Sequence, residues 1–128
     1  MALNIILAED DALVAMVVAD WLEAEGHSVI VTADGVQALA AARRLSRLDL
    51  LVADLRMPHL GGEDLIRTLW ADRPGLPVVV ITGSALQGGV EALRREAGYG
   101  GPLALLHKPF HHAALIASLH HLIGSPVA

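Results

Sequence analysis

Short apolar runs alternate along the chain with longer stretches of helical pattern. Five of the runs are apolar at nearly every position, which is typical of strands buried on both faces of a parallel sheet. They predict strands over residues 3–8, 28–32, 50–53, 77–82 and 103–106. The intervening segments are long enough for crossover helices, which we expect over residues 12–25, 36–46, 63–71, 88–97 and 111–123.

This alternation predicts an α/β fold, a doubly wound five-stranded parallel sheet with helices on both faces. The 128 residues are close to the size of one compact domain, so we expect a single domain over 1–128 and no output domain. Hydrophobic residues make up 54% and charged residues 18%, which indicates a globular chain. Because the sequence starts at Met1 and ends soon after its last predicted helix, a stand-alone protein is preferred.

Charge and composition argue against several classes of protein. The net charge is -5 and the nine Lys and Arg residues are scattered, so direct binding to nucleic acid is not expected. The absence of Cys excludes disulfides and fits a reducing compartment. The apolar start of the chain is too short for a signal peptide, and no run approaches the roughly 18 apolar residues of a membrane span. We therefore expect a cytoplasmic protein without membrane contact.

Reactive side chains gather where the predicted strands end. In open parallel sheets the functional crevice lies outside the carboxyl ends of the strands. Four of the five strands end at or next to acids, a hydroxyl or an amine: Glu9, Asp10 and Asp11, then Asp54, then Thr82, then Lys108. Clustered carboxylates suit Mg2+, and a carboxylate can attack phosphorus to form an aspartyl phosphate. An amine and a hydroxyl can stabilise the phosphoryl oxygens, so these residue types predict phosphoryl transfer.

Over nearly its whole length the chain resembles the receiver domain of two-component response regulators, in particular the single-domain receivers of the chemotaxis type. The resemblance rests on four pieces in order: Ile6-Leu7-Ala8-Glu9-Asp10-Asp11, Asp54-Leu55-Arg56-Met57-Pro58 with Gly61-Gly62, Val80-Ile81-Thr82-Gly83, and Lys108-Pro109-Phe110. Each piece is weak alone, but together at strand ends they are highly specific. The resemblance implies the flavodoxin-like receiver fold.

The resemblance also implies a role for each residue of the predicted site. Asp54 would accept the phosphoryl group, Thr82 would hold it after transfer, and Lys108 would pair with its oxygens. Mg2+ would be bound by Glu9, Asp10, the carboxylate of Asp54 and the backbone carbonyl of Arg56. We expect Asp11 to cap the first helix instead of binding metal.

By the same resemblance, the phosphoryl group would come from a histidine kinase or a histidine phosphotransfer protein. Its transfer to Asp54 would depend on Mg2+ and would switch a protein-interaction surface. A downstream protein would bind at the helix over 88–97, the strand over 103–106 and the helix over 111–123. The chain would be no enzyme beyond catalysing its own phosphorylation and dephosphorylation, and a homodimer is compatible with the sequence.

Two features depart from the family pattern. Receivers often carry Tyr or Phe three residues before the lysine, and here that position is Leu105, so the usual aromatic switch is in question. The 26 positions between Thr82 and Lys108 are a few more than usual, and we expect the extra residues around 88–89 or 99–102. The paired histidines at 111–112 and 120–121 lack the spacing of a helical zinc site and are interpreted as a solvated or partner-facing surface.

Three alternatives remain at the level of sequence. A degenerate receiver would bind a partner without phosphorylation, although the intact Asp54, Thr82 and Lys108 set argues against it. A phosphatase of the haloacid dehalogenase type also uses an aspartate after a strand, but its usual second acid is replaced here by Arg56 and no cap domain is present. A receiver belonging to a larger protein, such as a hybrid histidine kinase, is the third.

Overall fold

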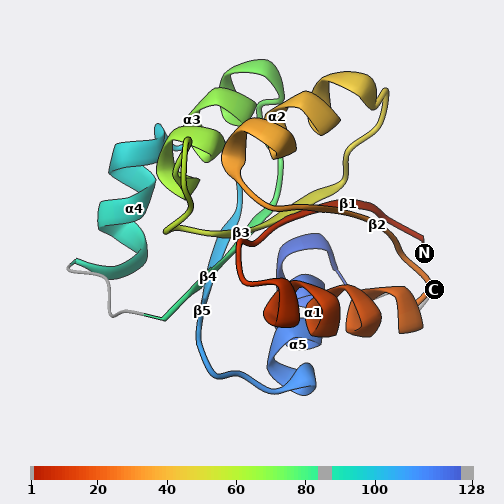
Figure 1. The fold of residues 1–128 in the computed structure, drawn as a ribbon. Helices are drawn as coiled ribbons and strands as arrows, with labels where there is room; N and C mark the ends of the chain where they lie inside the picture. Colours follow the sequence, from red (N-terminus) through yellow and green to blue (C-terminus); the bar gives the residue numbers. More distant parts are fainter. Residues whose placement is uncertain (1, 84–87, 125–128) are drawn as a thin grey trace.

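In the part of the chain that the structure describes, five strands and five helices alternate strictly (Figure 1). The computed structural model describes residues 2–83 and 88–124. The strands are β1 (Asn4–Ala8), β2 (Ser28–Thr32), β3 (Leu50–Asp54), β4 (Val78–Thr82) and β5 (Leu103–His107). The helices are α1 (Ala12–Ala24), α2 (Gly35–Arg44), α3 (Gly62–Asp72), α4 (Gly89–Ala97) and α5 (His112–Ile123).

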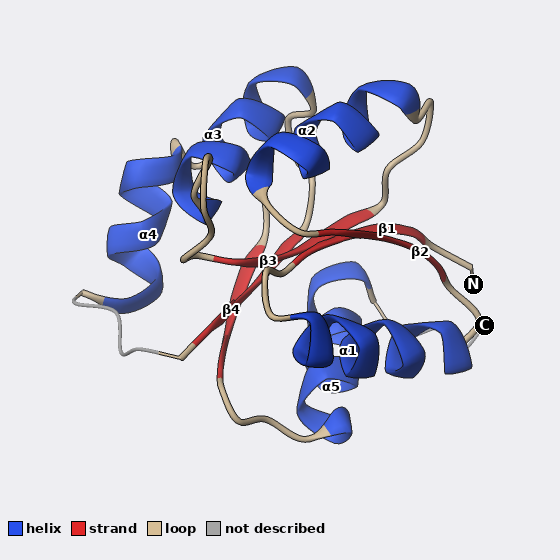
Figure 2. Ribbon diagram, in the orientation of Figure 1, coloured by secondary structure: helices blue, strands red, loops and turns tan. Residues whose placement is uncertain are grey.

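The strands form one parallel sheet in the order β2-β1-β3-β4-β5. Helices α1 and α5 cover one face, and α2, α3 and α4 cover the other (Figure 2). The order reverses direction between β1 and β3, which is the switch point where open α/β sheets bind their ligands. The predicted doubly wound, flavodoxin-like fold is confirmed.

Two hydrophobic cores lie on the two faces of the sheet. On the α2–α4 side, the core includes Leu51, Val80 and the buried face of α3 with Leu65 and Leu69. On the α1 and α5 side, strand residues pack with Leu22 and Leu115. Because alternate residues of the central strands point to opposite faces, β3 and β4 are buried at every position, as their continuous apolar runs predict.

The helix starts follow from local capping. The Asp11 carboxylate accepts hydrogen bonds from the backbone N–H groups of Leu13 and Val14, at 3.0 and 3.3 Å, so the predicted cap of α1 is confirmed. At α2, Asp34 accepts from the N–H of Gln37 at 2.8 Å. This cap starts α2 at Gly35, one residue earlier than predicted, and the other element boundaries differ from prediction by no more than two residues.

Strand β2 differs from the expectation that every strand is buried on both faces. It lies at the edge of the sheet, where β1 is its only strand partner among the described residues. Ile30 is 39% exposed and Val31 is 50% exposed. An apolar run indicates that a strand is hydrophobic, but it does not indicate whether a second strand or a helix covers that strand.

His27 is expected to contribute a loss of stability on mild acidification. Its Nδ1 atom accepts a hydrogen bond from the backbone N–H of Leu3 at 3.1 Å, next to the start of β1, which requires the neutral ring. Burial lowers the pKa of His27. The unfolded chain therefore binds the extra proton first, and the contribution of His27 to the free energy of unfolding decreases as the pH falls below the unfolded value of about 6.5.

Urea unfolding measured between about pH 7.5 and 5.5 checks this expectation. Over that interval the free energy of unfolding of the wild type should decrease relative to that of His27→Gln, whose side-chain oxygen can still accept from Leu3. His121→Gln, at an exposed position, is the matched control and should behave as the wild type. An identical change in the free energy of unfolding in wild type and His27→Gln would contradict the proposed role of His27.

Candidate functional site

Four neighbouring strands bring their carboxyl ends to one edge of the sheet. Glu9 follows β1, Asp54 ends β3, Thr82 ends β4 and Lys108 follows β5. Glu9, Asp54 and Thr82 are 2%, 6% and 1% exposed, whereas Asp10 is exposed. The structure thus brings together the residues that the strand-end argument selected.

Lys108 joins the two buried acids. Its ammonium Nζ donates to Asp54 Oδ2 at 3.0 Å and to Glu9 Oε1 at 3.1 Å. The three residues are widely separated in sequence, so only the parallel sheet places them in contact. An ammonium shared between two carboxylates holds both in place and partly neutralises them.

The protonation of the site reflects its burial and its charges. Burial raises the pKa of Glu9 to about 7, and the charge of Asp54 adds to this rise, while the hydrogen bond from Lys108 opposes it. For Lys108, burial acts to lower the pKa, but the hydrogen bonds to Asp54 and Glu9 outweigh it and the pKa is raised. Lys108 is therefore a permanent cation, and a second positive neighbour would lower the raised pKa of Glu9 and favour its charged form.

A divalent cation fits the acids that remain. One oxygen from each of Glu9, Asp10 and Asp54 lies within 4.8 Å of the others, and no other group of this kind occurs in residues 2–83 and 88–124. Glu9 Oε2 is buried and has no hydrogen-bond partner among the described residues. Three carboxylates against one ammonium leave excess negative charge, and oxygen ligands are what Mg2+ prefers.

The loop after β3 holds the Asp54 carboxylate in place. The N–H of Arg56 donates to Asp54 Oδ1 at 3.2 Å, so both carboxylate oxygens are oriented. The chain then turns back, and the N–H of Gly62 donates to the carbonyl of Leu55 at 3.0 Å. A Cβ atom at Gly62 would lie 2.6 Å from the backbone oxygen of Asp54, so glycine permits this close return.

Thr82 is tied to Lys108 through the backbone. The N–H of Lys108 donates to the carbonyl of Thr82 at 2.7 Å, at the point where β4 and β5 end. The buried hydroxyl-bearing residue and the lysine are thus held in register across two strands. Donors from two separate elements can then act on one oxygen-rich group bound above Asp54.

Comparison with known protein families identifies the family of this chain. The model of the response regulator receiver domain matches residues 5–120. The chain belongs to this family. It is a receiver domain of the two-component signalling type, a class whose general function is to accept a phosphoryl group and whose acidic pocket binds Mg2+.

Individual relatives agree with the family. A response regulator receiver protein of Anaeromyxobacter sp. strain Fw109-5 is 38% identical over 104 residues, covering 81% of this chain and 42% of the relative. The cell cycle response regulator CtrA of Brucella ovis is 29% identical over 121 residues, covering 94% of this chain and 50% of that protein. The receiver chain therefore spans about half the length of the curated relatives it matches.

Solved structures share the fold. The receiver domain of the sensor histidine kinase PA1611 of Pseudomonas aeruginosa PAO1, described with a magnesium ion coordinated in its active site cleft, is 34% identical with a TM-score of 0.79. The match covers 98% of this chain and all of that one. The chemotaxis protein CheY4 of Vibrio cholerae has a TM-score of 0.83 at 22% identity, covers 95% of this chain and 99% of its own, and shows the fold alone.

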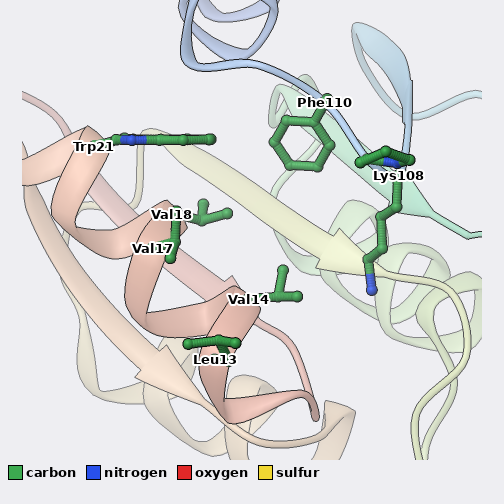
Figure 3. Close-up of a pocket in the computed structure, with 8 residues that line it drawn as sticks. Leu13, Val14, Val17, Val18, Trp21, Lys108 and Phe110 are labelled. Atoms are coloured by element: carbon green, nitrogen blue, oxygen red, sulfur yellow. The ribbon is translucent and has the colours of Figure 1, made fainter.

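An apolar groove adjoins the site, and the sequence analysis missed it. It has a volume of about 490 Å³ and lies between α1 and the segment after β5. Figure 3 shows Phe110 between Trp21 and Lys108. The Trp21 and Phe110 rings meet edge to face with centroids 6.2 Å apart. The exposed Leu13 and Val17, 66% and 36% exposed, could have signalled this groove, because α1 is apolar around much of its circumference.

The structure also bears on the two departures from the family pattern. Leu105 lies half-buried in β5, packed against the core on the α2–α4 side, and presents no ring. Of the positions expected to hold extra residues, Gly88 and Tyr99 have positive φ and flank α4, while the segment 84–87 lies outside the described residues. Among the described residues, the histidines belong to no metal-ligand group, and His112 lies edge to face with Trp21.

Proposed function

We propose that this receiver accepts a phosphoryl group on Asp54 from a histidine kinase or a histidine phosphotransfer protein. The observation that carries the proposal is the pair of hydrogen bonds from Lys108 to Asp54 and Glu9. They orient a buried carboxylate beside a permanent cation. The intact site also favours this function over a module that binds partners without phosphorylation.

In the proposed reaction, an Asp54 carboxylate oxygen forms a bond to phosphorus while the bond from phosphorus to the donor's imidazole nitrogen breaks. The electron pair of the broken bond returns to the imidazole. Lys108 moves its hydrogen bond from the carboxylate to a phosphoryl oxygen, and Thr82 donates its hydroxyl hydrogen to another. The chain thereby catalyses only its own phosphorylation and dephosphorylation, and hydrolysis returns Asp54 to the carboxylate.

The residues that would hold Mg2+ are Glu9, Asp10 and Asp54, together with the backbone carbonyl of Arg56. When bound, Mg2+ would neutralise the charge that builds on the phosphoryl oxygens. Glu9 supplies the buried oxygen that has no hydrogen-bond partner within residues 2–83 and 88–124, and Asp10 supplies an exposed carboxylate. The proposal thus gives each acid a separate task.

The donor is proposed to approach over the apolar groove, because Lys108, which donates to Asp54 and Glu9, lines that groove. The output surface is proposed on α4, β5 and α5, since Thr82 and Lys108 connect directly to the segments before α4 and after β5. Because Leu105 stands in place of an aromatic ring, the conformational change on phosphorylation would mainly affect α4. We further propose that the chain acts in the cytoplasm as one receiver domain over 1–128, without direct contact to nucleic acid.

One observation supports a second setting for the same chemistry. The solved receivers that resemble the chain include domains of histidine kinases, PA1611 at 34% identity and the hybrid kinase CckA at 27%. A receiver acting within or beside such a kinase would accept the phosphoryl group at the same Asp54. Within residues 2–83 and 88–124, no helix is long and apolar enough to cross a membrane.

Asp54→Asn is expected to abolish phosphoryl incorporation, because the amide replaces the nucleophilic oxygen while keeping the side-chain shape. Intact-mass spectrometry after incubation with acetyl phosphate and Mg2+ measures it. Asp11→Asn, which changes a capping acid outside the metal group, is the matched control and should incorporate one phosphoryl group as the wild type does. Full labelling of Asp54→Asn would refute the acceptor.

Asp10→Ala is expected to weaken Mg2+ binding about tenfold or more, because it removes one of three carboxylates that share the cation. Isothermal titration calorimetry with MgCl2 measures the affinity. Asp20→Ala serves as the control for net charge, because it removes an exposed acid of α1 that does not belong to the metal group. Equal Mg2+ affinity in Asp10→Ala and wild type would exclude Asp10 from the metal site.

A further inference from the structure

Within the described part of the chain, the outer side of the edge strand β2 has no strand paired with it. The N–H of Ser28 donates to the carbonyl of Leu3 and the carbonyl of Thr32 accepts from Glu9, so the residues at 28, 30 and 32 turn their backbone groups toward β1. In a parallel pair alternate residues face opposite sides. Val29 and Val31 therefore turn their N–H and C=O groups toward the open edge.

This edge lacks the usual devices that prevent strand pairing. Natural edge strands carry charges, prolines or bulges, whereas the five residues of β2 are Ser, Val, Ile, Val and Thr in regular register with β1. Apolar side chains are exposed on both sides of the edge. Val31 and Met16 of α1, 50% and 57% exposed, line one side, and Ile30 points to the opposite face. A strand added here would cover both sides at once.

The sequence of β2 is nearly symmetric about Ile30. If a second copy pairs antiparallel with Ile30 opposite Ile30, Val29 faces Val31 of the other copy, and Ser28 faces Thr32. Val29 and Val31 are the residues whose backbone groups are free to pair, so this register places them in the two hydrogen-bonded pairs and Ile30 in the non-bonded pair between them. Any register shifted by one residue would set outward groups against inward ones.

We propose that two copies of this chain associate through β2, forming one continuous ten-stranded sheet with a two-fold axis at Ile30. A second copy is favoured over an unrelated strand because one β2 edge complements another. The facing side chains match, and the residues with outward backbone groups lie opposite each other. A groove of about 450 Å³ between α1 and β2, with Ala12, Ala15 and Ala19 in its wall, leaves room for the partner's Val31 and Met16.

The interface would be small. A five-residue strand pair with its flanking apolar residues falls near or below the roughly 1,200 Å² of total buried surface that stable complexes reach, so the dimer is weak and reversible. Asp10 and Asp20 line the same groove, and the two copies would bring these acids toward one another. Added salt screens that repulsion and should therefore strengthen the association.

Cysteine cross-linking tests the register, and the wild-type chain contains no cysteine. In the proposed dimer the Ile30 Cα atoms would be about 4.5 Å apart, within disulfide range. Under mild oxidation, Ile30→Cys is expected to form a covalent dimer at least about tenfold faster than Val31→Cys. The two Val31 Cα atoms would be roughly 7–8 Å apart, and Val31→Cys should cross-link efficiently only when mixed with Val29→Cys.

Sedimentation equilibrium of the wild type provides the second measurement. The average mass should rise with protein concentration and with salt, and Val31→Lys, at a half-exposed position, should remain monomeric with an unchanged circular dichroism spectrum. A wild type that stays monomeric at the highest concentration would overturn the proposal and leave the edge to another protein's strand. Equal cross-linking of Ile30→Cys and Val31→Cys would overturn it as well. Neither measurement involves Asp54, so both are independent of the proposed phosphorylation.

Discussion

Replacing Lys108 with alanine is expected to slow phosphorylation of Asp54 by acetyl phosphate about 100-fold or more, the usual cost of losing one preorganised donor to a developing charge. The loss has two physical sources. Asp54 loses the ammonium that orients Oδ2, and the transferred group loses the cation that would receive its oxygens. Time courses followed by intact mass measure the rate directly.

The controls separate charge from position. Lys108→Arg keeps the charge, but a planar guanidinium cannot occupy the point that an ammonium shares between Asp54 and Glu9, so most of the rate should still be lost. Arg56→Ala removes a nearby exposed cation while keeping the backbone N–H that bonds Asp54, and it should retain most of the rate. A Lys108→Ala protein that is folded and phosphorylated at the wild-type rate would contradict the proposed role.

Gly62→Ala is expected to destabilise the fold by about 2–3 kcal/mol, which is typical of an added methyl group in a packed site. The new Cβ would lie 2.6 Å from the backbone oxygen of Asp54 and 2.8 Å from the Cα of Leu55. Backbone must move to relieve these contacts, and the backbone that moves carries Asp54, the proposed phosphate acceptor. Urea unfolding measures the loss of stability, and the phosphorylation rate should fall with it.

The neighbouring glycine offers a matched control. At Gly61 an added Cβ would have its nearest neighbour, the carbonyl oxygen of Leu55, at 3.4 Å, and φ is -74°, which alanine adopts freely. Gly61→Ala should therefore cost less than about 1 kcal/mol. If the two variants lose the same stability, the close return of the chain beneath Asp54 is not what requires glycine at position 62.

The sequence predicted the fold well because hydrophobic runs and helix caps are local signals. The continuous apolar run ending in Asp54 marks a strand buried on both faces, and the structure has it so. Family membership confirms the receiver fold that four short motifs indicated. The roles of the individual site residues rest on the geometry of the strand ends and remain predictions to be tested by the variants above.

Other features depend on contacts between distant segments, which a single sequence does not encode visibly. The run over β2 looks as apolar as the central strands, yet its position at the edge exposes Val31. The contact of Trp21 with Phe110 joins α1 to the segment after β5, and neither residue has a local pattern that reveals the other. The shared hydrogen bonds of Lys108 were likewise invisible before Glu9 and Asp54 were placed side by side.

The position of Lys108 has a practical consequence, because it is the only lysine in the sequence. An amine-directed label, such as reductive methylation with carbon-13 formaldehyde, can attach to a single side chain in the whole protein besides the N-terminus. With its ammonium held by two carboxylates and its pKa raised, that amine should react slowly in the resting domain. The labelled methyl groups would give one isolated side-chain NMR signal at the centre of the site, sensitive to every change in the acids around it.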